Sequence, residues 1–290
     1  MSEITKAVIP CGGLGTRFLP ITKAVPKEIL PVIDTPVLAY IVDEAIESGI
    51  TDILIVLGRG KEAIKQYFTC DPELEDSLNK AGKHDLLAVV KKIASGVNVR
   101  FTYQEKPLGS GDAVRLARSF TGNEAFALAW GDDIIYSEKP VIGQLIAAYK
   151  NTGKSVLGVQ SVLTDDIVKY GVAKVGENSG RTYDCFAVVE KPPINEIPSR
   201  LASLGRYILT PDIYAEIDRL TPSVGGELQF TDALNALCGK GRVCAYDFEG
   251  RRYDMGDKFG SVQATVEYAL RSNEFGDEMK RYLKELTKTL

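Results

Sequence analysis

Short apolar runs alternate with amphipathic segments along the first 160 residues of the chain. Apolar runs at 6–10 and 52–57 have the length of buried strands, and residues 98–103, 124–130 and 155–161 also have strand character. Between them, residues 36–48, 60–68, 112–119 and 141–150 have helical character, and the first of these segments carries proline in its first turn. This alternation predicts an α/β fold in which a mixed, mostly parallel sheet is covered by helices on both faces.

Three later features depart from this alternation. Residues 69–96 are charged, have leucines at helical spacing and are too long for a simple connection, which predicts a helical insertion. Residues 171–175 and 185–189 are predicted strands on either side of a turn-rich stretch, 176–181, and resemble a sheet excursion that closes over a site. The helical pattern and alternating charges of residues 258–290 predict C-terminal helices that are solvated or contact another subunit. Because no linker or repeat is visible, we expect a single domain over 1–290.

Composition excludes several classes of partner. A net charge of -4 argues against nucleic acid or an anionic membrane as the main partner, since both attract clustered cations. The apolar runs are far shorter than the roughly 20 residues of a membrane-spanning helix, and the first residues lack the zones of a signal peptide. Five cysteines without a C-x-x-C pair and one histidine, His84, disfavour a zinc site. We therefore expect a cytoplasmic protein with reduced thiols.

A glycine-rich segment, Cys-Gly-Gly-Leu-Gly-Thr-Arg at 11–17, directly follows the first predicted strand. Glycines let backbone N–H groups approach a polyanion closely, and Arg17 adds a cation. The segment matches neither G-x-G-x-x-G nor the P-loop, so a tight strand-to-helix turn explains it equally well. Residues 23–31 then add Lys23 and Lys27 between prolines, where little helix is available to spread the charge. Together, the two segments favour a phosphate-binding site.

Acidic residues follow three predicted strands. Asp132 and Asp133 come after the strand at 126–130, at the carboxyl end where open α/β sheets bind their ligands. Carboxylates beside a phosphate site suit Mg²⁺, although an Asp-Asp pair is also common in turns and helix caps. Asp254 ends another strand-like run and is a candidate second carboxylate. Glu190 and Lys191 place an acceptor and a cation side by side for a sugar hydroxyl and a phosphate, or form a surface turn.

Taken together, these motifs resemble the bacterial UTP-glucose-1-phosphate uridylyltransferase family of sugar nucleotidyltransferases, and the match runs essentially end to end. The matching segments are 13–20, 23–31, 45–61, 131–134, 190–192 and 226–232. Related thymidylyl- and adenylyltransferases share the glycine loop, but the helical insertion and the Lys-Glu-Ile-Leu-Pro form at 27–31 resemble the uridylyl group. The resemblance implies a Rossmann-like three-layer αβα nucleotidyltransferase fold.

The resemblance also implies a reaction and a set of site residues. The expected reaction joins UTP to glucose-1-phosphate with Mg²⁺ and gives UDP-glucose and pyrophosphate, in a homodimer or homotetramer. For the nucleotide, it implies that the backbone of Gly12, Gly13, Leu14 and Gly15 forms a cradle. It also implies that Gln104 and Gly109 contact the uracil and that Glu28 supports this pocket. For the phosphates, metal and sugar it implies Arg17 and Lys27 at the triphosphate, Asp132 and Asp254 at magnesium, Gly171 and Glu190 at glucose hydroxyls, and Lys191 at the sugar phosphate.

Three positions depart from the family pattern. The family usually has alanines at the positions of Cys11 and Gly12, and a histidine at the position of Asp112. An acid at 112 is expected to cap the following helix or to alter contacts near the nucleotide. Two alternative functions stay open: the same chemistry with another nucleotide or hexose phosphate, and a non-catalytic nucleotide-sugar sensor.

Overall fold

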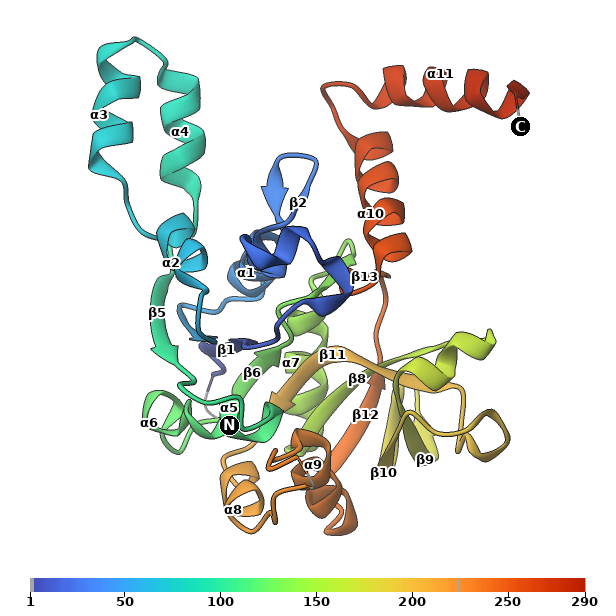
Figure 1. Ribbon diagram of the computed structural model, residues 1–290. Helices are drawn as coiled ribbons and strands as arrows, with labels where there is room; N and C mark the ends of the chain where they lie inside the picture. Colours follow the sequence, from blue (N-terminus) through green and yellow to red (C-terminus); the bar gives the residue numbers. More distant parts are fainter. Residues whose placement is uncertain (1–2, 224, 290) are drawn as a thin grey trace.

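A large mixed sheet forms the centre of the computed structural model, which describes residues 3–223 and 225–289 (Figure 1). Within these residues the sheet has nine strands in the order β5-β4-β1-β6-β11-β8-β12-β10-β9. Their bounds are β1 (Lys6–Cys11), β4 (Asp52–Leu57), β5 (Asn98–Tyr103), β6 (Phe126–Ala129), β8 (Ser155–Ser161), β9 (Gly171–Ser179), β10 (Thr182–Glu190), β11 (Leu201–Leu209) and β12 (Val243–Asp247). All of them run in one direction except β10 and β11, which confirms a mixed, mostly parallel sheet.

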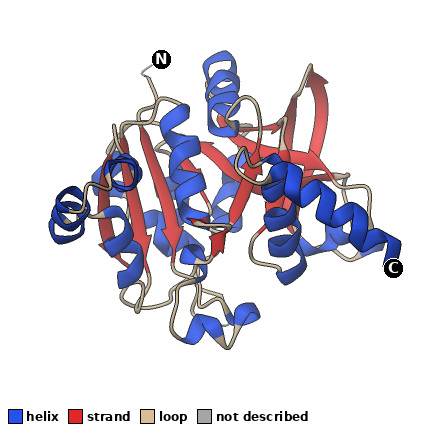
Figure 2. Ribbon diagram, turned by 90° about the horizontal axis from the view of Figure 1, so that it is seen from above, coloured by secondary structure: helices blue, strands red, loops and turns tan. Residues whose placement is uncertain are grey.

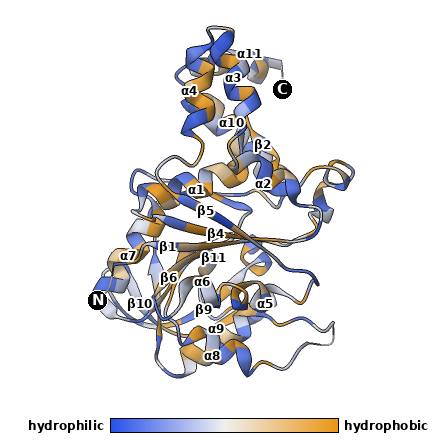
Figure 3. Cartoon of the chain, turned by 90° about the vertical axis from the view of Figure 1, so that its left-hand side faces the viewer, coloured by the Kyte–Doolittle hydropathy of each residue, from blue (hydrophilic) through white to orange (hydrophobic). Residues whose placement is uncertain are grey.

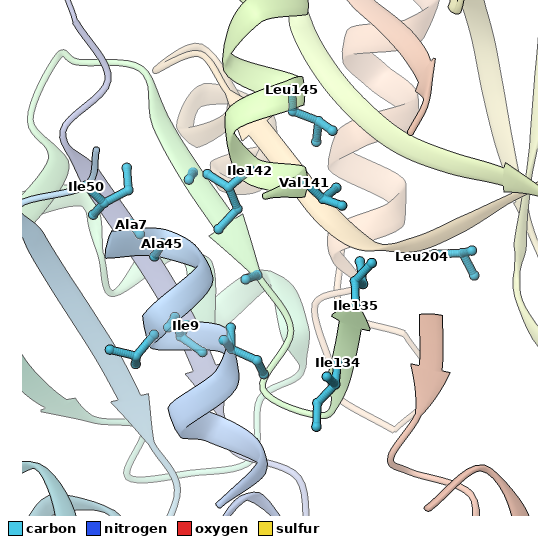
Figure 4. Close-up of a cluster of buried hydrophobic side chains, with 14 of the residues drawn as sticks. Ala7, Ile9, Ala45, Ile50, Ile134, Ile135, Val141, Ile142, Leu145 and Leu204 are labelled. Carbon is cyan, nitrogen blue, oxygen red and sulfur yellow. The ribbon is translucent and has the colours of Figure 1, made fainter. Parts of the chain in front are cut away.

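Helices cover both faces of this sheet (Figure 2). Because successive side chains of a strand point to opposite faces, Ala7 and Ile9 of β1 join one core cluster and Val8 joins the other. The first cluster includes side chains of two helices, α1 (Val37–Glu47) and α7 (Val141–Thr152), and Figure 4 shows them meeting β1 and β11. The second includes side chains of α5 (Ser110–Arg115), α8 (Ile213–Asp218) and α9 (Phe230–Gly239). The predicted three-layer arrangement is therefore confirmed.

Two helix pairs stand away from the sheet (Figure 1). The 69–96 stretch contains α3 (Pro72–Lys80) and α4 (His84–Lys92), and the C-terminal stretch contains α10 (Lys258–Arg271) and α11 (Gly276–Leu286). Aspartates begin both pairs: Asp71 accepts from the backbone N–H of Leu74, and Asp257 from that of Gly260, each at 3.0 Å. Apolar positions lie on both pairs as well as along the sheet (Figure 3). Among the described helices, none is both long and apolar enough to cross a membrane.

The remaining elements are short. Two small antiparallel ribbons pair β2 (Pro31–Val32) with β3 (Thr35–Pro36), and β7 (Asp133–Tyr136) with β13 (Arg251–Asp254). The other α-helices are α2 (Glu62–Phe68) and α6 (Arg118–Thr121).

The stretch predicted as a turn at 176–181 is mostly strand. β9 continues to Ser179, β10 begins at Thr182, and only two residues join them. The pair is also not a separate excursion, because β10 pairs with β12 and so forms the end of the main sheet. Gly176 belongs to the strand because the Phe186 ring lies across it, at 2.7 Å from where a β-carbon would stand. The glycine therefore marks close packing here and no turn.

A buried ion pair joins four elements next to the sheet's carboxyl edge. Arg206 of β11 has no solvent exposure and donates to both carboxylate oxygens of Glu44 in α1, at 2.8 to 3.1 Å. Its guanidinium also donates to the backbone oxygen of Asp133 at 2.8 Å, at the start of β7. Glu44 in turn accepts from the backbone N–H of Ile142 in α7 at 3.0 Å. This pair therefore fixes where β7 begins relative to the two helices.

Replacing Glu44 by glutamine should destabilise the protein strongly, because the Arg206 charge would stay buried without a counter-charge. The expected loss of unfolding free energy is about 3 to 5 kcal/mol, measured by chemical denaturation. The matched control is Asp76→Asn, which removes one partner of the exposed Lys80–Asp76 pair and should cost no more than about 0.5 kcal/mol. A loss below about 1 kcal/mol for the Glu44 variant would contradict the role given to the pair.

Candidate functional site

Two adjoining cavities open at the carboxyl edge of the sheet. The smaller, of about 370 Å³, is lined by residues that directly follow β1, β5 and β6. The larger, of about 1290 Å³, extends towards β9, β10 and β13. Ser110, Trp130 and Asp132 line both cavities. Two ligands bound one in each cavity would therefore meet at Asp132, where open α/β sheets place their ligands.

The smaller cavity gathers most of the residues expected at the nucleotide. These are Gly12, Gly13, Leu14, Lys27, Glu28, Gln104 and Gly109. After the glycine segment, the chain turns through three short 3₁₀ helices, Thr16–Phe18, Ile21–Lys23 and Lys27–Ile29. This path returns Lys27 to the loop, so that a β-carbon on Gly13 would lie 3.5 Å from its Nζ. Gly15, with φ of 66°, makes the left-handed turn and is absent from the lining.

The motif at 226–232 closes the far side of the smaller cavity. The backbone of Leu228 accepts from the N–H of Gly111 at 2.8 Å and donates to the carbonyl of Leu108 at 2.7 Å. Gly109 lies between these two bonds with φ of 94°, and a β-carbon on it would stand 2.5 Å from the Leu228 oxygen. This position therefore requires glycine both for its backbone angle and for the close approach.

The larger cavity gathers the residues expected at the sugar and the metal, which are Asp132, Gly171, Glu190, Lys191 and Asp254. Arg17, expected at the triphosphate with Lys27, also lines this cavity and is absent from the lining of the smaller one. Gly171 pairs with Glu190 across β9 and β10, and a β-carbon on Gly171 would lie 3.2 Å from the carboxylate Oε2. Lys191 Nζ is 3.7 Å from Oε1 of Glu190, and its side chain is 65% exposed. Gly171, the Glu190 carboxylate and the exposed Lys191 ammonium group therefore lie together at one wall of the larger cavity.

Asp132, at the boundary of the two cavities, is surrounded by cations. It forms an ion pair with Lys27. Burial alone would raise the pKa of Asp132, but Lys27, Arg17 and Arg252 together hold that pKa below its ordinary value. Burial likewise opposes the charge of Lys27, yet the Asp132 carboxylate raises the pKa of this lysine. The boundary therefore keeps a carboxylate and an ammonium group charged in a confined space.

Asp132 and Asp254 approach each other from distant parts of the chain. The backbone N–H of Met255 donates to the carbonyl of Asp132 at 3.1 Å, and both aspartates line the larger cavity. Among the described residues, no three or more His, Cys, Asp or Glu side chains form a ready cage for a metal ion. Two carboxylates without such a cage fit Mg²⁺, which takes one or two protein carboxylates and completes its shell with water and substrate phosphates.

Sequence reasoning missed Arg252, although it lies in the same motif as Asp254. Its Nε donates to Asp133 Oδ1 at 2.8 Å, and its Nη2 is 3.4 Å from Asp254 Oδ2. The guanidinium also stacks over the Tyr170 ring, 4.6 Å from its centre. Arg252 therefore holds β13 against the start of β7. The sequence did offer a signal for Arg252, because it lies two residues before Asp254, a candidate metal ligand.

Lys61 was also missed, and it sits behind the smaller cavity. Its Nζ donates to Oε2 of Glu28 at 2.5 Å, and both residues are buried. Burial raises the pKa of Glu28, although Lys61 and Lys27 act against that rise. The arrangement agrees with a supporting role for Glu28, whose carboxylate is already occupied by Lys61.

The expected helix cap at Asp112 is wrong. The residue before α5 is Gly109, and Asp112 lies within the helix without capping it. Its carboxylate accepts from the side chains of Gln104 and Arg115, at 2.9 and 2.5 Å. Asp112 therefore bonds to the buried Gln104 on one side and to the half-exposed Arg115 on the other, and not to the backbone at the start of the helix.

The cavities, the glycine loop and the paired aspartates define a class of enzyme that transfers a nucleotidyl group. A family model described as nucleotidyl transferase matches residues 6–269, and the chain belongs to that family.

Within the family, the chain is similar over nearly its full length to named uridylyltransferases. It is 45% identical to the UTP-glucose-1-phosphate uridylyltransferase of Bacillus subtilis, over 99% of this chain and 98% of that protein. It is 48% identical to UTP-glucose-1-phosphate uridylyltransferase 2 of Staphylococcus saprophyticus, over 99% of both chains. A solved structure of UTP-bound UGPase from Acinetobacter baumannii has 35% identity and a TM-score of 0.91, over 98% of this chain and all of that one.

Replacing Lys61 by methionine should make stability depend on pH through Glu28. The pKa of the buried Glu28 carboxyl, already raised by burial, would rise further in the folded variant because Lys61 would no longer act against that rise. The loss of unfolding free energy relative to the wild type should be about 3 to 5 kcal/mol at pH 8. It should shrink as the pH falls through that raised pKa towards the ordinary glutamate value of about 4.3. Denaturation at pH 8 and pH 5.5 measures both.

The double variant Lys61→Met with Glu28→Gln is the control, because it has no carboxyl group to titrate. Its stability relative to the wild type should change little between the two pH values. A loss for the single variant that is equal at pH 8 and pH 5.5 would show that the carboxyl is not the cause.

Proposed function

We propose that the chain transfers the uridylyl group of UTP to glucose-1-phosphate, giving UDP-glucose and pyrophosphate. The observation that carries this proposal is the shared wall at Asp132, where the nucleotide-side and sugar-side cavities meet. The named activity of the relatives and the UTP in the solved structure support the choice of substrates.

Each cavity takes one substrate in this proposal. The backbone of Gly12, Gly13 and Leu14 cradles the nucleotide in the smaller cavity, where Gln104 and Gly109 face the base. Gly15 supports this cradle from outside the lining, by making the turn that follows it. Glucose-1-phosphate lies in the larger cavity, with its hydroxyls near Gly171 and Glu190 and its phosphate at Lys191. The glycine at 171 leaves room beside Glu190, because a β-carbon would crowd the carboxylate.

The chemistry then needs alignment more than a base. A phosphate oxygen of the sugar phosphate forms a bond to the α-phosphorus of UTP, while the bond from that phosphorus to the bridging oxygen breaks and pyrophosphate leaves. The attacking phosphate is already ionised near neutral pH, since its second pKa is about 6. Lys191 reduces repulsion between the two anions, and Arg17 and Lys27 stabilise charge on the leaving group. Asp132 and Asp254 would hold a bound Mg²⁺, which would supply further positive charge to the phosphates.

Two alternatives predict different behaviour. A nucleotidyltransferase for another nucleotide or hexose would keep the phosphate-binding residues and differ only at the two outer ends of the site. A nucleotide-sugar sensor would bind without turnover. The presence of Arg17, Lys27, Asp132 and Lys191 in the lining of the two cavities disfavours it, because binding alone does not need the full set.

We further propose that the enzyme assembles as a homodimer or homotetramer in the cytoplasm. Exposed apolar side chains on α10 and α11 support the assembly: Phe259, Val262, Tyr282 and Leu286. All five cysteines are free thiols, as is usual in a reducing compartment.

Pyrophosphate release over a matrix of nucleotides and sugar phosphates tests the proposal. UTP with glucose-1-phosphate should give the highest kcat/KM, and EDTA should abolish turnover because the phosphates lose their metal. Another nucleotide that wins by tenfold would overturn the choice of UTP. Tight binding of UDP-glucose without turnover of any pair would favour the sensor.

The two lysines should fail differently. Lys191→Ala should mainly raise the KM for glucose-1-phosphate, since it removes a charge-assisted contact worth about 1.5 to 3 kcal/mol, or roughly tenfold to a hundredfold in affinity. Lys27→Ala should instead lower kcat, because its contact strengthens as pyrophosphate leaves. Steady-state kinetics and calorimetry with each ligand separate the two outcomes.

The exposed Lys83→Ala variant is a control for charge removal far from the cavities and should match the wild type. If Lys191→Ala weakened UTP many-fold and left glucose-1-phosphate saturation unchanged, the sugar site would not lie beside Glu190.

A further inference from the structure

Asp112 occupies a buried position at the back of the smaller cavity. It lies in α5 with 4% of its surface exposed, and it does not line the cavity itself. One carboxylate oxygen, Oδ2, accepts from Nε2 of Gln104 at 2.9 Å. The other, Oδ1, accepts from Arg115 at 2.5 Å. Both oxygens are therefore engaged, and one of them touches a residue that faces the nucleotide.

The chemistry of these contacts fixes the orientation of the Gln104 amide. Its Nε2 donates to the carbonyl of Gly109 at 3.0 Å as well as to Asp112. A carbonyl and a carboxylate can only accept hydrogen bonds, so the amide atom between them has to be the NH₂ group. Turning the amide over would place an oxygen against two other oxygens. The carbonyl oxygen of Gln104 must therefore point the other way.

That oxygen faces the cavity beside the glycine loop. A β-carbon on Gly12 would lie 2.9 Å from Oε1 of Gln104, and both residues line the cavity. No described residue donates to Oε1, and among the described residues no buried side-chain nitrogen or oxygen lacks a partner. Oε1 is therefore accessible, and it presents a hydrogen-bond acceptor to whatever fills the cavity.

We propose that Asp112 is a positioning residue that sets base specificity by fixing Gln104 as an acceptor. An acceptor suits a pyrimidine whose ring N3 carries a hydrogen, as in uracil, and opposes cytosine, whose N3 is itself an acceptor. The inference rests on the proposed placement of the nucleotide in the smaller cavity. It assigns the choice between uracil and cytosine to a side chain that does not touch the base.

The test compares two neutral replacements of similar shape. Asp112→Asn keeps an oxygen for Gln104, and Arg115, whose side chain is 44% exposed, can turn to water. Asp112→Leu removes the acceptor, so that only Gly109 still orients the amide. Calorimetry without glucose-1-phosphate gives the affinities for UTP and CTP, so the result does not depend on turnover. A failure of the proposed reaction would appear separately, as UTP binding without pyrophosphate release.

The ratio of UTP to CTP affinity is the readout, because a merely structural role would weaken both nucleotides alike. We expect the ratio to fall about tenfold to a hundredfold in the leucine variant, the range for loss of a hydrogen bond to a charged group. The asparagine variant should stay within about threefold of the wild type. If the leucine variant does not fold, Asp112→Ser, whose hydroxyl is too short to reach Gln104, should show the same fall. An unchanged ratio in a folded leucine or serine variant, or a wild type without preference for UTP, would overturn the proposal.

Discussion

The buried pair of Glu44 and Arg206 is the interaction on which the geometry of the site most depends. Arg206 comes from β11, one of the two strands that run against the rest of the sheet, and it holds the backbone of Asp133 directly. Because Asp132 precedes that backbone, its position at the cavity boundary follows from a contact made deep in the core. Removing a charge from such a pair leaves the other uncompensated, so the arrangement tolerates little change.

Charge pairing continues from the core to the cavities. Glu44 with Arg206, Glu28 with Lys61, and Asp133 with Arg252 are all pairs with little solvent exposure. Glu28 lines the smaller cavity, and Asp133 and Arg252 line the larger one. Their partners are already engaged, so they supply rigidity and not binding. Arg17 and Lys191 differ, because they line the larger cavity and, among the described residues, neither belongs to a buried ion pair. The site therefore separates charges that hold the scaffold from charges available to phosphates.

The local pattern predicted most of the elements, because strand and helix periods are properties of short segments. β1, β4, β5 and β8 follow from the sequence within a residue or two, and the helical insertion expected over 69–96 contains α3 and α4. Gln104, Asp132 and Glu190, to which the resemblance assigns roles, line the cavities. The long turn at 176–181 was wrong because Gly176 indicates a turn locally, whereas the Phe186 ring requires it in a strand. Arg206, Arg252 and Lys61 were missed because their partners lie 162, 119 and 33 residues away, and no local period reports such pairings.

The late position of β11 in the sequence leaves one edge of β6 unpaired while the chain is being synthesised. β6 (Phe126–Ala129) is fully buried in the finished sheet, where it pairs with β1 on one edge and β11 on the other. On the ribosome, the β11 edge has no partner until residues 201–209 emerge, long after the first half of the sheet can assemble. An apolar strand with an open edge is a template for pairing with other chains. The nascent first half therefore carries an open apolar strand edge until β11 is made.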